Sequence, residues 1–269
     1  MPFTLSHAAA SLPFRRLKPV WPALVMGTFA PDLQYFILIS DEDRSGHHFP
    51  DVLLFTLPFA VLVLWLFERI VKGPVIALLP SSLQRRLQDK TAPLSFSGWR
   101  HFGSIVLWIA VGIATHIGWD QFTHSYSELA SYSAFLHVRV PLPMGHSIQF
   151  GHLLQHISTV GGIAVLGMWV AGWYRRTPPV VRMEEKFSPR LKIALAVTMA
   201  AIAGLLGYPI SVLRLANRVH PVRPLYLAVT VFEATTLVLC LELLIYGLAL
   251  TLNNRLRRVS ATQADEPGD

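Results

Sequence analysis

The chain has 269 residues, of which 52% are hydrophobic and only 14% are charged, and its mean hydropathy is +0.45. Soluble domains carry about 25% charged residues, so this composition excludes an ordinary soluble domain and predicts an integral membrane protein. The formal net charge is +7, but the basic residues gather in short segments between apolar runs. We therefore expect no nucleic-acid partner and interpret the basic residues as a signal of membrane topology.

The first predicted element is a short helix over residues 4–14. It is too short to cross a bilayer and is expected to form half of a membrane-inserted hairpin. Six apolar segments follow, each close to the length of about 20 residues that a spanning helix needs. They cover residues 21–39, 51–71, 102–119, 155–174, 191–213 and 225–252. We predict an all-α integral membrane protein with about six apolar helices plus the short N-terminal helix. One helical membrane domain is expected over residues 1–258, and a disordered polar tail over 259–269.

Alternating these segments across a bilayer places most lysines and arginines on one side. The same alternation places every histidine except His101 on the other side. By the positive-inside rule the basic side is cytoplasmic, so the histidines face the extracytoplasmic side. We expect a protein of the bacterial cytoplasmic (inner) membrane that is surrounded by membrane lipids; the sequence does not specify an oligomeric state.

The third apolar segment ends in THIGWDQFTH, which brings polar side chains to the end of a membrane helix. His116, Asp120 and His124 recur at i, i+4 and i+8, so they share one face of a continuing helix. Ionisable side chains are expensive in an apolar setting and mark functional sites. His124 also fits an interfacial histidine with no chemical role.

Further candidate ligands are expected on the same side of the membrane. His7 lies in the first helix, and Asp32 follows a proline within an apolar run. His47 and His48 precede the next helix, and one of them is expected to take part. His156 lies one turn below His152 on the fourth long segment. Each has a structural alternative, namely helix capping for His7 and Asp32, solvation in a loop for the histidine pair, and snorkelling for His156.

Histidine and aspartate together form the ligand set of zinc, and also of manganese and iron sites. The single cysteine, Cys240, lies in the last apolar segment, which argues against a thiolate-rich structural site. The sequence therefore predicts a divalent metal site, with zinc the leading choice. Its predicted ligands are His7, Asp32, His47, His48, His116, Asp120, His124 and His156.

Four stretches of the sequence resemble the bacterial family catalogued as domain of unknown function 4184. They are MPFTLSHAAASLP, GTFAPDLQYF, GHHFPDVLLFTLP and GIATHIGWDQFTH. The same order of elements is more distantly similar to membrane-bound metal-dependent hydrolases and to zinc-dependent phospholipase C. Carried over residue by residue, the second resemblance implies metal ligands at His7, Asp32, His48 (or His47), His116 and Asp120.

The leading functional hypothesis is metal-assisted hydrolysis of a lipid or another amphiphilic ester, and a phosphodiester is the form that the resemblance implies. Asp32 or Asp120 is the candidate general base. The alternative is a non-enzymatic membrane protein, such as a metal transporter, an assembly factor or a histidine-based pH sensor. The apolar lower halves of the segments disfavour a conduction path. A pH sensor accounts for clustered histidines but not for their pairing with aspartates.

Overall fold

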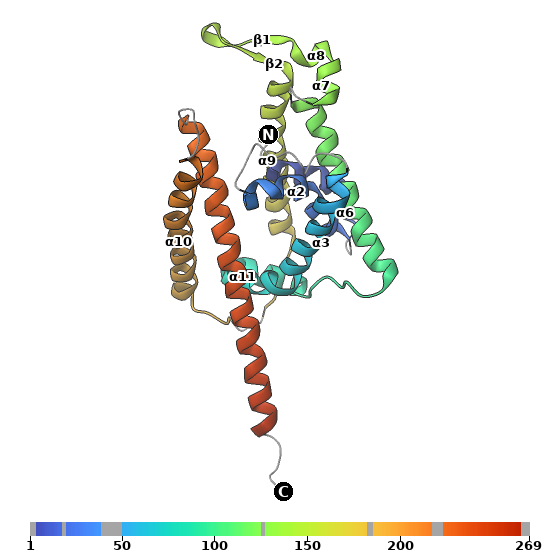
Figure 1. Cartoon of the computed structure of the whole chain (residues 1–269). Helices are drawn as coiled ribbons and strands as arrows, with labels where there is room; N and C mark the ends of the chain where they lie inside the picture. The colour runs from blue at the N-terminus through green and yellow to red at the C-terminus, as the bar shows by residue number, and fades with distance from the viewer. Residues whose placement is uncertain are drawn as a thin grey trace. The chain divides into compact units, whose positions relative to one another are not determined.

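The computed structural model describes residues 4–17, 20–38, 50–124, 127–181, 185–216 and 223–264, and within these ranges the chain is almost wholly helical (Figure 1). The elements in chain order are α1 (Thr4–His7), η1 (Ala8–Phe14), α2 (Trp21–Leu38), η3 (Val52–Thr56), α3 (Leu57–Leu66), η4 (Phe67–Val71), α4 (Lys72–Leu78), α5 (Ser81–Leu87), η5 (Gln88–Lys90), α6 (Trp99–Thr123), α7 (Glu128–Tyr132), α8 (Ala134–His137), β1 (Arg139–Pro141), η6 (Pro143–Gly145), β2 (Ser147–Gln149), α9 (Phe150–Arg176), α10 (Pro189–Leu215) and α11 (Pro224–Ala264).

Five helical stretches of the described chain are long and apolar enough to cross a membrane, which makes the protein a helical membrane protein. They are Val52–Leu78, Trp99–Thr123, Phe150–Arg176, Pro189–Leu215 and Pro224–Asn254. The first is continuous through η3, α3, η4 and α4, where η3 and η4 are π-helical turns.

The first of the six predicted segments, residues 21–39, forms the helix α2 but is not among these candidate spans, so the count of about six is not confirmed. α2 has only 18 residues and includes Pro31, Asp32 and Gln34, which make it less apolar than the other five. The N-terminal segment is helical as expected, with a single α-turn followed by the 3-10 helix η1. At the other end, α11 continues to Ala264, past residue 258, where we expected the tail to begin.

The chain forms two compact units. The first contains Met1–Gln34, Asp41–Leu64 and Ser95–Arg176, and the second contains Tyr35–Ser40, Trp65–Leu94 and Thr177–Asp269. The prediction of one domain over residues 1–258 stays a prediction, and each unit is described separately below.

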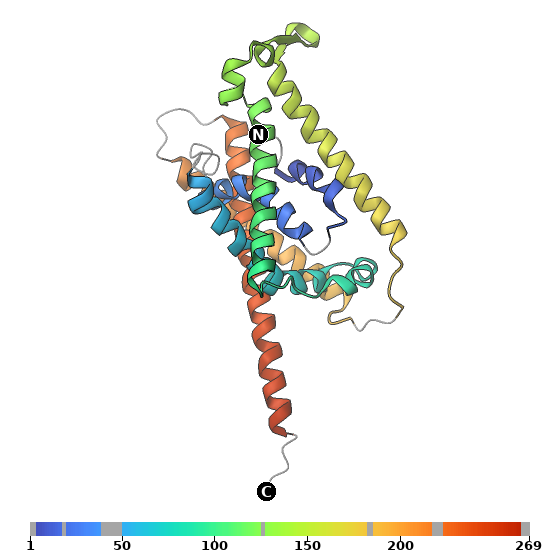
Figure 2. The same cartoon turned by 90° about the vertical axis from the view of Figure 1, so that its right-hand side faces the viewer.

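In the first unit, the N-terminal segment α1–η1 lies between the long helices α6 and α9 (Figures 1 and 2). Two glycines allow close approach. A Cβ on Gly162 of α9 would lie 2.8 Å from the Ser6 Cβ, and a Cβ on Gly112 of α6 would lie 2.7 Å from the Gly27 Cα of α2. Both distances are shorter than any ordinary carbon contact. Glycine is therefore what lets α1 and α2 pack directly against the long helices.

The turn from α6 to α9 carries the short helices α7 and α8 and a two-stranded hairpin, which extend beyond the ends of the two long helices (Figure 1). β1 and β2 pair antiparallel, with Val140 opposite Ile148. This hairpin is a small departure from the predicted all-α fold. At its tip Met144 and Gly145 both adopt positive φ angles, 61° and 76°, because the chain must reverse direction within a few residues.

In the second unit, α10 packs against α11, and a Cβ added to Gly207 of α10 would lie only 2.8 Å from the backbone nitrogen of Thr235. A buried carboxylate of η4 in the second unit is bonded to α4 and to the segment that follows η5. Glu68 accepts hydrogen bonds from the Lys72 ammonium group and from the Leu94 N–H, each at 2.8 Å, and the same Lys72 group donates to the Ala92 carbonyl oxygen at 2.9 Å.

Candidate metal centre

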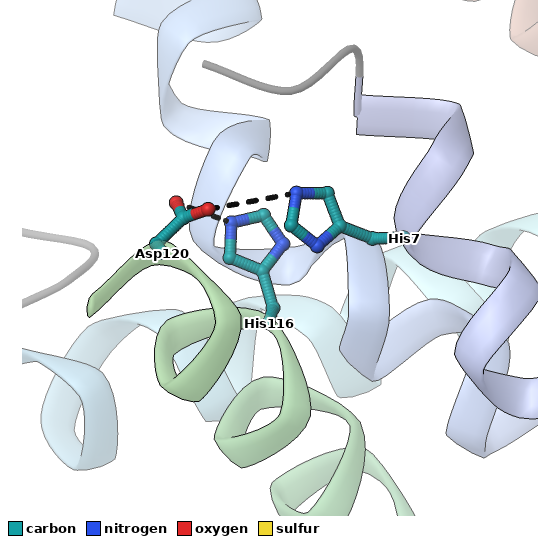
Figure 3. Close-up of side chains that lie close together, drawn as sticks. All are labelled: His7, His116 and Asp120. Atoms are coloured by element: carbon teal, nitrogen blue, oxygen red, sulfur yellow. Dashed lines mark ion pairs between the residues drawn. The ribbon is translucent and has the colours of Figure 1, made fainter. Parts of the chain in front are cut away.

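The candidate site lies in the first unit, and α6 supplies two of its side chains. His116 and Asp120 are one helical turn apart, as their spacing predicts, and both are buried. The Nε2 atom of His116 lies 3.3 Å from Oδ2 of Asp120. Figure 3 shows the two side chains rising from the same helix toward His7.

His7, at the end of α1, completes a group of three. Its Nε2 atom lies 3.7 Å from Oδ1 of Asp120 (Figure 3). Its ring stacks on that of His116, with centroids 3.9 Å apart and planes at 16°. Within the described part of the chain, His7 Nε2 makes no hydrogen bond. These three buried residues offer ligand atoms that all lie within 4.8 Å of one another, so the group could hold a metal ion.

Asp32 borders the group from α2. Its Oδ1 atom lies 3.5 Å from His116 Nε2, and its Oδ2 atom accepts a hydrogen bond of 2.7 Å from the hydroxyl of Thr4. The carboxylate is completely buried. Asp32 therefore has one oxygen directed at the site and one fixed by the same short helix that carries His7.

The orientation of His116 is set by α2. Its Nδ1 atom lies 2.8 Å from the carbonyl oxygen of Thr28, an acceptor, so Nδ1 carries the proton and donates it. The lone pair of a neutral ring then lies on Nε2, the atom that faces both carboxylates. A histidine that donates one N–H to a backbone carbonyl while the other nitrogen faces outward is the usual arrangement of a metal ligand.

The spacing of the donor atoms suits a metal ion. Ligands bound to zinc at about 2.0–2.1 Å in a tetrahedron are about 3.3 Å apart. The separations from Asp120 to His116 and to His7, and from Asp32 to His116, are 3.3, 3.7 and 3.5 Å. Hence little movement is needed for nitrogen and oxygen atoms to reach coordinating distance.

Burial keeps His7 in the form that a metal requires. Removal of the ring from water lowers the pKa of His7 from its ordinary value of 6.5 to about 4, and the adjacent His116 lowers it in the same direction. At neutral pH His7 is therefore an uncharged imidazole, whose nitrogen lone pair is available.

The other predicted ligands have different positions. His124 ends α6 and is buried, with its Nδ1 atom 3.6 Å from Oδ1 of Asp120 and 3.2 Å from the Asp120 carbonyl oxygen. It borders the group of three without belonging to it. His156 is exposed on α9, and the structure does not bring it into the group. His47 and His48 lie outside the described residues.

Sequence reasoning missed the groups that hold the ligands in place. The Thr28 carbonyl is a backbone atom, which no residue pattern reveals. The hydroxyl of Thr4 was also missed, although its position three residues before His7 gave a faint signal. Glycines 27, 112 and 162 position three of the helices, and sequence alone does not distinguish them from the other glycines.

Fold and site together define a helical membrane protein with a buried histidine–aspartate centre in one of its two units. The sequence profile of a family described as "Domain of unknown function (DUF4184)" matches residues 1–250, and the chain belongs to that family. The first resemblance inferred from the sequence is thereby confirmed. Comparison with curated proteins and comparison with solved structures give no match.

Proposed function

We propose that the protein is a membrane-embedded metal-dependent hydrolase, with zinc the leading metal and manganese or iron the alternatives. Its proposed substrate is a lipid or another amphiphilic phosphoester. The distribution of basic residues supports a site at the extracytoplasmic face of a bacterial inner membrane.

One observation carries the proposal, the convergence of His116 with two carboxylates. Because Nδ1 donates to the Thr28 carbonyl, the Nε2 atom of His116 faces one oxygen of Asp32 and one of Asp120, at 3.5 and 3.3 Å. Two carboxylates in a buried site are costly without a compensating charge. A divalent cation supplies that charge, because it balances two negative charges and can bind a nitrogen atom and carboxylate oxygens at the same point.

The residues divide into ligands and a base. His7, His116 and Asp120 form the donor set for the ion, and the carbonyl of Thr28 orients the His116 ring. A bound divalent metal supplies Lewis acidity, which makes water more acidic and polarises an ester oxygen. Asp32 is the candidate general base, since Oδ2 is fixed by Thr4 while Oδ1 faces the site and can accept a proton there.

Hydrolysis of a chromogenic phosphodiester and of phospholipids in mixed micelles tests the proposal. We expect turnover by the purified protein to require zinc, manganese or iron and to be abolished in His116→Ala. Asp32→Asn should retain metal and lose turnover by about 100-fold or more, the usual contribution of a general base. His146→Ala, which changes an exposed histidine, is the matched control. Turnover that survives His116→Ala at the wild-type rate would refute the proposal.

A further inference from the structure

A pocket of about 460 Å³ adjoins the candidate metal centre and has His7 in its wall. Its other walls come from η1, α6 and α9, all within the first unit. The volume lies in the range of small-molecule sites. Small residues create the space, since Ala9, Ala10, Gly161 and Gly162 line it on two opposing elements.

The lining of the pocket selects for an apolar ligand. Apart from His7 it contains no charged or ionisable side chain, and Leu154 and Ile157 contribute alkyl surface. The hydroxyls of Thr115 and Ser158 donate to carbonyl oxygens of their own helices, at 2.7 and 3.0 Å. These two hydroxyls therefore offer no donor to a ligand, and the remaining polar groups of the lining, those of Ser6, His7 and Trp119, are few for a sugar or a nucleotide, which would lose many hydrogen bonds to water on entry.

We propose that this pocket holds the hydrocarbon chain of an amphiphilic phosphate ester whose headgroup lies at the metal centre. The inference rests on the proposed function and adds the binding site for the substrate chain. His7 belongs both to the donor set and to the pocket wall, so one molecule can occupy both. Trp119, next to Asp120 in sequence, also lines the pocket, and its ring has the amphipathic character suited to the boundary between chain and headgroup.

The pocket can be filled without disturbing the backbone. A Cβ at Gly161 meets no atom within 4 Å, so Gly161→Leu places its side chain in open space. Ala10→Leu fills the pocket from the opposite wall and serves as the second variant, should the first misfold. Gly103→Leu is the matched control, because Gly103 is an exposed α6 glycine that also has open space at its Cβ and does not line the pocket.

Photolabelling with an alkyl phosphate that carries a diazirine at the end of its chain measures occupancy without turnover. In the wild type we expect labelled peptides from η1 and α9, and competition by the same alkyl phosphate without the diazirine. Gly161→Leu and Ala10→Leu should reduce this labelling about tenfold, the effect of a moderate overpacking cost. Gly103→Leu should label like the wild type, and metal content should be unchanged in all variants that fold.

Labelling that spreads over all lipid-facing helices and resists competition would overturn the inference, since the pocket would then hold only bulk membrane lipid. Wild-type labelling in the two filled variants would also overturn it. These outcomes are independent of the proposed function. A protein that neither binds metal nor hydrolyses esters refutes the hydrolase, while the labelling pattern still decides whether the pocket binds the chain.

Discussion

The contact between α2 and α6 gives the sharpest test of how the fold builds the metal centre. In Gly112→Ala the added Cβ would meet the Leu24 carbonyl oxygen and lie 2.7 Å from the Gly27 Cα. Carbon atoms in contact are about 3.5 Å apart or more, so the two helices must separate by about 0.8 Å. The hydrogen bond between His116 Nδ1 and the Thr28 carbonyl, now 2.8 Å, would then lengthen to about 3.6 Å and be lost.

Loss of a hydrogen bond that orients a ligand typically costs about 10–100-fold in metal affinity, and this is the decrease we expect for Gly112→Ala. Zinc affinity would be measured in detergent by competition with a chromogenic chelator. Gly118→Ala is the control, because Gly118 is an exposed glycine of the same helix and its Cβ would meet no atom within 4 Å. Equal zinc affinities for the two variants would refute the reasoning.

Three further predictions follow from other contacts. Gly162→Ala should weaken zinc binding, because the added Cβ displaces α1 and with it His7. Gly161→Ala should leave zinc binding unchanged, because its Cβ would meet no atom within 4 Å; the same chelator competition measures both affinities. Lys72→Met leaves the buried Glu68 carboxylate without its ion pair and should destabilise the protein by about 3 kcal/mol. The Tm should therefore fall in Lys72→Met and stay unchanged in Lys90→Met, which alters an exposed lysine. Finally, zinc should raise the Tm of the wild type and a chelator should reverse the rise, because a ligand of the folded state stabilises it by mass action; an unchanged Tm would contradict zinc binding.

Several features of the fold and the site could be predicted because they depend on local pattern. The spans follow from runs of apolar residues, and the proximity of His116 and Asp120 follows from helical periodicity. The placement of His7 and Asp32 near this pair was also predicted, from topology and from the cost of an aspartate in an apolar run.

Other features were beyond the sequence for physical reasons. α9 is apolar around much of its circumference, and lipid is as apolar as a protein neighbour, so its pattern does not reveal that His156 is exposed. α2 is apolar enough to suggest a span, yet much of it is buried inside the first unit, with Leu24, Thr28 and Asp32 at 2% exposure or less. Burial of that kind depends on tertiary contacts, which periodicity does not specify.

The central claim is that the buried histidines and aspartates bind a metal ion. The most direct measurement is metal content by inductively coupled plasma mass spectrometry on detergent-purified protein. We predict near-stoichiometric zinc, manganese or iron in the wild type, and loss of that metal in Asp120→Asn. The control Asp89→Asn, which alters an exposed carboxylate, should keep the metal. A folded wild type that binds none of these metals, even after reconstitution with an excess of each, would contradict the account. A proton on His116 Nε2 would then have to hold the two carboxylates together.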